Sequence, residues 1–214
     1  MNPQSESAGA CVTRELEGAD VRLGQRLAAH RESAFVKAVA KAAKLGDQEP
    51  LYAFSALLAI TGLVSRRPRL VEAGFRMGVA VAVADLAKSG LKRRVRRTRP
   101  HVLLDEARYE RSAVGSEEKP EQSFPSGHVA AAVAAASALR HVYPGSLRYS
   151  APLCGLLGWS RMSKGDHWPA DVAAGAGIGL AAEAATSWVW RPTGRARRGL
   201  RTLMGGMRNM AWRR

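Results

Sequence analysis

Three short stretches of this sequence hold residues able to bind and attack an anionic group. The first is residues 123–128, which read SFPSGH. Pro125 and Ser126 are typical of a first helical turn and its cap, and the free amides of such a turn attract anions. Gly127 lets the backbone approach a ligand closely. His128 lies on the same turn and is able to give a proton to whatever binds there. A capped helix start with no function has the same pattern.

The second stretch is residues 92–100, which read KRRVRRTRP. Lys92 and Arg99 are seven positions apart, so on a helix they would project from one face, two turns apart. Pro100 would then end that helix. Two cations so placed are able to grip one anion. The basic flank of a membrane segment, or a patch that binds polyanions, would give the same run of charges.

The third stretch is residues 160–171, which read SRMSKGDHWPAD. His167 and Asp171 are four positions apart at an expected helix start, so the carboxylate can accept a hydrogen bond from one ring nitrogen. This fixes the tautomer and leaves the other nitrogen with a free lone pair. An oriented, neutral imidazole is a nucleophile. An incidental pair on a capped helix is the alternative reading.

Helices must position these residues, because apolar stretches with little charge separate them. The stretches cover residues 51–64, 70–87, 126–143, 149–160 and 168–190. The last includes a face of small residues, Gly175, Gly177 and Gly179, with Gly175 and Gly179 at the spacing that lets membrane helices pack closely. If the helices run up and down, the end of the helix before Lys92, the starts of the helices at Ser126 and His167, and the end of the helix at Arg161 fall on one side. Residues 92–100, 123–128 and 160–171 would then form one site.

The segments outside these stretches are polar or amphipathic. Residues 1–20 are predicted to be a flexible tail, and residues 101–122 a loop or lid. Residues 21–45 have apolar side chains every three to four positions opposite a basic face, which predicts an amphipathic helix at a membrane interface. Residues 191–214 form a strongly basic C-terminal tail.

Composition limits the partners. The 214 residues have a formal net charge of +15, which points to nucleic acid, an anionic membrane or a phosphorylated substrate. The mean hydropathy of −0.18 is that of a soluble protein. However, the arginines cluster in runs and leave uncharged segments between them, as in membrane helices with basic flanks. Cys11 and Cys154 define neither a disulfide framework nor a zinc site. No clustered carboxylates could hold a metal, which fits metal-free phosphoryl transfer.

Together the stretches resemble the three signature motifs of the type 2 phosphatidic acid phosphatase and vanadium haloperoxidase superfamily. The matching positions are Lys92 with Arg99-Pro100, then Pro125-Ser126-Gly127-His128, then Ser160-Arg161 with His167 and Asp171. The resemblance covers residues 51–190. It implies an all-α bundle of about six helices, mostly transmembrane, with the active site where four helix ends meet. It also implies a metal-independent hydrolysis of lipid phosphates through a phosphohistidine, with no cofactor.

The resemblance gives each matching residue a role. His167 would be the nucleophile, Asp171 its orienting partner and His128 the general acid. The phosphate ligands would be Lys92, Arg99, Ser126, Gly127 and Arg161, with Ser160 in support. The four arginines between Lys92 and Arg99 are more than the motif demands, and we expect them to grip anionic head groups or a diphosphate.

The leading prediction is therefore an integral membrane lipid phosphatase with anionic lipids, and not nucleic acid, as its partners. Its substrate would be phosphatidic acid, phosphatidylglycerol phosphate, a polyprenyl diphosphate or a prenyl-linked sugar phosphate. The positive-inside rule favours a cytoplasmic tail in the cell membrane and a site that faces outward, as is usual in the family. Two alternatives stay open: a soluble acid phosphatase or vanadate-dependent haloperoxidase of the same superfamily, and a non-enzymatic polyanion binder.

Overall fold

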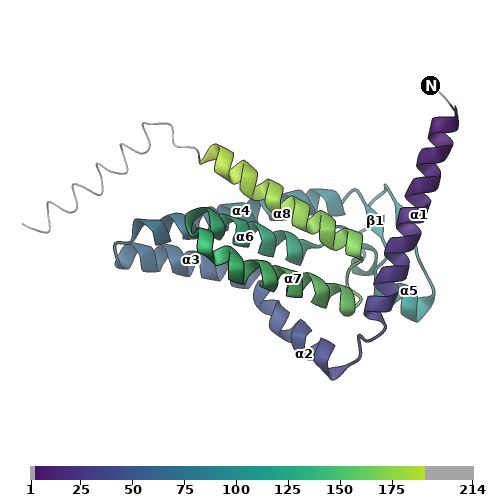
Figure 1. Cartoon of the computed structure of the whole chain (residues 1–214), viewed down its shortest axis with the longest axis horizontal. Coiled ribbons are helices and arrows are strands. Elements are labelled where there is room, and N and C mark those ends of the chain that lie inside the picture. Colours follow the sequence, from purple (N-terminus) through teal and green to yellow (C-terminus); the bar gives the residue numbers. More distant parts are fainter. Residues whose placement is uncertain (1–2, 191–214) are drawn as a thin grey trace, which may run out of the picture.

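The computed structural model describes residues 3–190, with side chains from residue 14 onward, and this part of the chain is mostly helical (Figure 1). The bundle consists of α3 (Gln48–Val64), α4 (Pro68–Lys92), α6 (Gly127–Val142), α7 (Leu147–Ser163) and α8 (Pro169–Val189). These bounds lie close to those of the five apolar stretches, which confirms the all-α prediction. The predicted basic tail, 191–214, is outside the described residues.

Small residues allow the bundle helices to pack closely. A side chain at Gly179 would place its Cβ 2.6 Å from the carbonyl oxygen of Ala130, so α8 lies directly against the backbone of α6. Gly175 faces the carbonyl oxygen of Ser126 in the same way. Gly74 on α4 lies against Ser55 on α3, where a Cβ would be 2.5 Å from the Ser55 oxygen. The predicted close packing is therefore confirmed at Gly175 and Gly179 but not at Gly177, where a Cβ would meet no atom within 4 Å.

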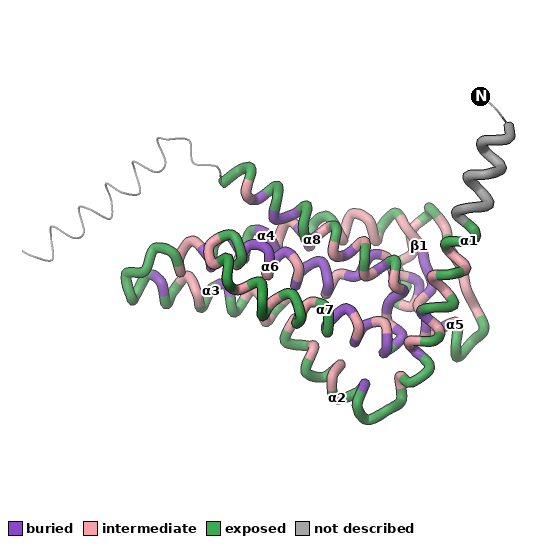
Figure 2. The backbone as a smooth tube through the Cα atoms, in the orientation of Figure 1, coloured by how far each residue is buried: buried purple, intermediate pink, exposed green. Residues whose placement is uncertain are grey.

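The core of the bundle is built from small side chains, and many of the large apolar ones face outward. Alanines of α4, α6 and α8, such as Ala80, Ala134 and Ala182, are buried together. The buried positions run along the middle of these helices, while much of the surface of α3 and α7 is exposed (Figure 2). The exposed apolar side chains on the bundle include Phe54, Leu57, Ile60, Leu63, Phe75, Leu86, Leu153, Leu156, Leu180 and Trp188. Many exposed large apolar side chains on one bundle are typical of contact with lipid.

The lengths of the helices support membrane crossing for fewer of them. Of the helices in the described part of the chain, α8 alone is both long and apolar enough to cross a membrane by itself. The α3 and α7 helices each have 17 residues and α6 has 16. A span of the hydrocarbon core usually takes about 20 residues.

The N-terminal segment differs from its prediction. Helix α1 covers Pro3–Ala28, where a flexible tail up to residue 20 was expected. The expected helix over 21–45 is divided, because Ser33 accepts a hydrogen bond from the Val36 amide and so starts a new helix, α2 (Ala34–Ala42), followed by η1 (Ala43–Gly46). Helix α1 lies across one end of the bundle, beside β1 and α5 (Figure 1).

The segment after α4 is also more ordered than a loop. Strand β1 (Arg96–Arg97) pairs antiparallel with β2 (Arg111–Ser112), and α5 (Pro100–Glu106) and η2 (Lys119–Glu121) complete it. Buried Glu121 ties the segment together through Arg96 at 2.6 Å and Arg108 at 2.8 Å. Because α4 ends at Lys92, the prediction that Lys92 and Arg99 share one helix face is wrong.

Candidate active site

Four helix ends meet at the end of the bundle that α1 covers. They are the C-termini of α4 and α7 and the N-termini of α6 and α8. The ring centroids of His128 and His167 are 6.4 Å apart. The Ser126 amide donates to the Asp171 carbonyl oxygen at 3.0 Å, and Lys92 Nζ donates to the Gln122 carbonyl oxygen at 3.3 Å. Residues far apart in the sequence thus surround one space, as the three motifs require.

The His167 imidazole is oriented by a backbone carbonyl. Its side chain is 2% exposed, and Nδ1 donates to the carbonyl oxygen of Ser123 at 2.7 Å. This leaves Nε2 with a free lone pair. Asp171 Oδ2 is 3.9 Å from Nδ1, so the expected hydrogen bond between Asp171 and His167 is not made. The Asp171 carboxylate instead accepts from Arg97 Nη1 at 2.7 Å and from the Trp168 amide at 2.8 Å.

The surroundings of His167 keep its ring neutral. Burial, reinforced by the positive charges of Arg99 and Lys92, lowers the pKa of His167 well below its usual value. The imidazole is therefore uncharged at neutral pH. A buried, oriented and neutral imidazole has the properties of a nucleophile.

The second imidazole, His128, is more open. Its side chain is 37% exposed, and Nε2 is 3.2 Å from Asp47 Oδ1. The same carboxylate oxygen accepts from Arg161 Nη2 at 2.9 Å. Asp47 precedes α3 and was not among the predicted site residues. Its only signal in the sequence is that of a helix cap, which does not reveal that α3 begins beside the site.

A second carboxylate, in addition to Asp47, lies beside the arginines of the site. Asp166, from the third motif, is 3.8 Å from Arg99 Nη1 and 3.6 Å from Arg161 Nη1. Several buried donor atoms at the site have no partner among the described residues, including Ser126 Oγ, Arg99 Nε and Arg161 Nε. A buried donor without a partner is costly, and phosphate oxygens are acceptors of the kind that such donors lack.

The structure alters several details expected of the motif residues. Ser126 is at the N-cap of α6, but its side chain makes no capping hydrogen bond, and Pro125 precedes the first turn instead of lying in it. A Cβ at Gly127 would lie 2.7 Å from Lys88 Cδ, so a larger residue there would push the flexible Lys88 side chain aside. The Ser160 hydroxyl donates to the Leu157 carbonyl oxygen at 2.8 Å, within its own helix, and is not free for a ligand.

Two of the extra arginines do not face a head group. Arg97 is buried and bonded to Asp171 and Asp20, and Arg96 is bonded to Glu121. For these two the expected grip on anionic head groups is wrong, because internal carboxylates already pair with them. Arg93 and Arg94 are exposed.

The site combines one buried imidazole, a second imidazole nearby, three cationic side chains and a helix N-terminus. Within residues 14–190, no group of three or more His, Cys, Asp or Glu side chains is arranged to hold a metal ion. Such an inventory binds a phosphate-like anion and supplies both a nucleophile and a proton donor.

Comparison with known proteins agrees with this class of site. The family model of the PAP2 superfamily matches residues 73–195, and the chain belongs to this superfamily. A search of curated proteins gave no match.

The fold is shared with several solved structures, among them the following two. One is LpxE of Aquifex aeolicus, with a TM-score of 0.55 and 22% identity over 77% of this chain and 92% of that one. The other is a transmembrane PAP2-type phosphatidylglycerolphosphate phosphatase of Bacillus subtilis, with a TM-score of 0.62 and 20% identity over 85% of this chain and 89% of that one.

Proposed function

We propose that this protein is a membrane lipid phosphatase that works through a phosphohistidine on His167, without a metal. The observation that supports this most directly is the distance of 6.4 Å between the rings of His128 and His167, with Arg99, Arg161 and Lys92 around them. The similarity to a transmembrane phosphatidylglycerolphosphate phosphatase supports a lipid phosphate as the substrate.

In the first step His167 Nε2 gives its lone pair to phosphorus, and the bond from phosphorus to the lipid oxygen breaks. The leaving oxygen takes a proton from His128, while Lys92, Arg99 and Arg161 stabilise the charge on the three equatorial oxygens. In the second step a water molecule gives its proton to His128 and attacks phosphorus. The bond to Nε2 breaks, and inorganic phosphate leaves with His167 neutral again.

The apolar exterior supports a location in the membrane over a soluble phosphatase or haloperoxidase. Side chains such as Leu57, Ile60 and Leu153 are more than half exposed, at 58%, 58% and 65%. We place the site on the outer face of the cell membrane, because α4 starts beside the exposed Arg66, Arg67 and Arg69 and ends at the site.

A cleft beside the site favours a substrate with a polar, anionic head group. It measures about 740 Å³, and Lys37, Lys41 and Lys44 from the α2–η1 segment line it together with Lys164 and Asp166. Asp166 also lies against Arg161, so the cleft adjoins the phosphate ligands. A head group with a second phosphate would extend into this cleft.

Release of inorganic phosphate from a lipid panel tests the function. The purified protein should hydrolyse at least one of phosphatidic acid, phosphatidylglycerol phosphate, polyprenyl diphosphate and a prenyl-linked sugar phosphate. EDTA should not inhibit it, and vanadate should. His167→Ala should abolish turnover and leave substrate binding nearly intact. Lipid hydrolysis by His167→Ala, or a strict need for magnesium, would contradict the proposal.

A further inference from the structure

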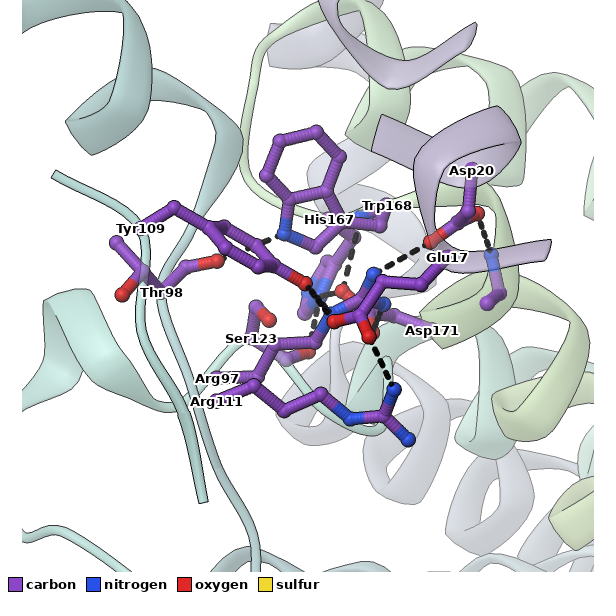
Figure 3. Close-up of polar contacts among 11 residues, drawn as sticks. Glu17, Asp20, Arg97, Thr98, Tyr109, Arg111, Ser123, His167, Trp168 and Asp171 are labelled. Atoms are coloured by element: carbon purple, nitrogen blue, oxygen red, sulfur yellow. Dashed lines mark hydrogen bonds and ion pairs between the residues drawn. The ribbon is translucent and has the colours of Figure 1, made fainter. Parts of the chain in front are cut away.

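Arg97 is a buried arginine directly behind the two motif residues Asp171 and His167 (Figure 3). Its side chain is 6% exposed. Nη1 donates to Asp171 Oδ1 at 2.7 Å and Nη2 donates to Asp20 Oδ2 at 2.5 Å. The guanidinium also lies 5.4 Å from the centre of the Trp168 ring. The Arg97 guanidinium thus pairs with two carboxylates, one from α8 and one from α1.

The backbone of Arg97 reaches His167 by a second route. Its carbonyl oxygen accepts from the Ser123 amide at 3.0 Å, and the Ser123 carbonyl oxygen accepts from His167 Nδ1 at 2.7 Å. One residue therefore positions both groups next to Nδ1: the carbonyl that bonds to it and the carboxylate 3.9 Å away.

Helix α1 closes this arrangement from outside. Asp20 Oδ1 accepts from the Ala170 amide at 2.8 Å. Glu17 accepts from the Tyr109 hydroxyl at 2.6 Å and from Arg111 at 2.9 Å. Gly24 lies flush against the Trp168 ring, where any Cβ would clash. Helix α1 thus contacts the start of α8 through Asp20 and Gly24.

We propose that Arg97 is a positioning residue for His167, and that α1 holds Arg97 in place through Asp20. The proposal rests on the function proposed above. Its physical basis is that Arg97 neutralises Asp171 and so keeps that carboxylate from pairing with the imidazole. The charged groups that face His167 are Lys92, Arg99, His128 and Asp171. Without Arg97 the Asp171 carboxylate would lose its charged partner and keep only the Trp168 amide, which would favour the protonated ring and turn Nδ1 away from Ser123.

The test compares Arg97→Gln with Arg97→Lys, Asp20→Asn and the exposed control Arg140→Gln on α6. Arg97→Gln should lower kcat by about 10²-fold at neutral pH, the cost of a misplaced nucleophile, with KM nearly unchanged. Its acidic limb of kcat/KM should move to higher pH, because a protonated His167 cannot attack, and raising the pH should restore part of the activity. The kcat and the acidic limb of Arg97→Lys should lie between those of Arg97→Gln and wild type. Lysine keeps the positive charge but lacks the planar guanidinium that donates to two carboxylates at once. Asp20→Asn should show the same shift to a smaller extent, and Arg140→Gln none.

NMR of the protein labelled with ¹⁵N-histidine gives a readout independent of turnover. In wild type the His167 ring should be neutral with the proton on Nδ1, and in Arg97→Gln its protonation midpoint should rise. If Arg97→Gln does not fold, Asp20→Asn and Arg97→Lys carry the same comparison. An unchanged pH profile and unchanged ring signals in these variants would overturn the positioning role while leaving the phosphatase intact. Absence of phosphate release by wild type would instead overturn the function, and the ring signals would still decide the role of Arg97.

Discussion

The two imidazoles at the site have different surroundings, and these divide the proposed chemistry between them. His167 is buried and donates Nδ1 to a carbonyl, which leaves Nε2 able to attack. His128 is partly exposed, and its Nε2 lies 3.2 Å from Asp47 Oδ1. The nucleophile is thus kept neutral and the proton donor has access to solvent, as two-step phosphoryl transfer requires.

This division predicts that the effect of His128→Gln depends on the leaving group. A lipid alkoxide needs a proton to leave, so kcat for the lipid phosphate should fall by about 10²- to 10⁴-fold. A nitrophenolate leaves without one, so formation of the phosphoenzyme from nitrophenyl phosphate, followed by the burst of nitrophenolate, should be little affected. His141→Gln, at the far end of the same helix, is the control. Equal losses with both substrates would mean that His128 is not the proton donor.

At this scale the sequence reveals the motif residues but not what supports them. The spacing of His167, His128 and Arg161 is recognisable because chemistry restricts which residue types can serve there. The Ser123 group that bonds to His167 is a backbone carbonyl, which every residue has, so no sequence pattern could reveal it. Arg97 was hidden within an arginine run, and Asp20 lies in a segment that showed no sign of approaching the site.

At the scale of elements, apolar stretches predicted the five bundle helices, and the segments between them were harder to foresee. A run of uncharged residues bounded by Pro or Gly determines a helix almost by itself. In contrast, residues 101–122 are ordered by distant ion pairs, such as that of Glu121 with Arg96. Helix α1 is positioned by contacts of Glu17 and Asp20 with residues about 80 to 150 positions later in the chain. Periodicity contains no information on such contacts.

Close packing of α8 on α6 predicts a position-specific cost along one glycine-rich segment. Gly179→Val should lower the free energy of unfolding by about 1–3 kcal/mol, because its side chain would meet the Ala130 oxygen and Val133. Gly177→Val is the matched control, since a Cβ there meets no atom within 4 Å. Thermal unfolding in detergent measures both. Equal destabilisation would indicate that the effect comes from the loss of glycine and not from packing.

The ion pairs of Glu121 predict how stability depends on pH. Hydrogen bonds from Arg96, Ser116 and Arg108 lower the pKa of Glu121 from 4.5 to about 2. A carboxylate with a depressed pKa stabilises the fold above its unfolded pKa, and this contribution is lost as the pH falls from 4.5 to 2. Glu121→Gln should therefore be less stable at neutral pH and should lose less stability over this range. The exposed Glu117→Gln should follow wild type in a thermal unfolding series, and identical acid limbs for Glu121→Gln and wild type would contradict the prediction.

At the scale of the whole molecule, the bundle places the groups of the candidate site at one end and many of its large apolar side chains on the outside. Alanine and glycine fill the interior, so helices of 16 or 17 residues pack closely while Phe54, Leu57 and Leu153 remain exposed. The four helix ends, α1 and the basic cleft are together at one end. A lipid whose chains lie along the apolar exterior would present its phosphate to that end.

The most direct test of this account is to trap the phosphoryl group on the protein. His128→Gln should form the phosphoenzyme from nitrophenyl phosphate but hydrolyse it slowly, because the water has lost its base. Rapid quenching at alkaline pH, followed by peptide mass spectrometry, should then find one phosphohistidine, at His167, and none in the double variant with His167→Ala. Phosphate on another residue, or turnover with no phosphorylated protein at any time, would contradict the central claim that His167 is the nucleophile.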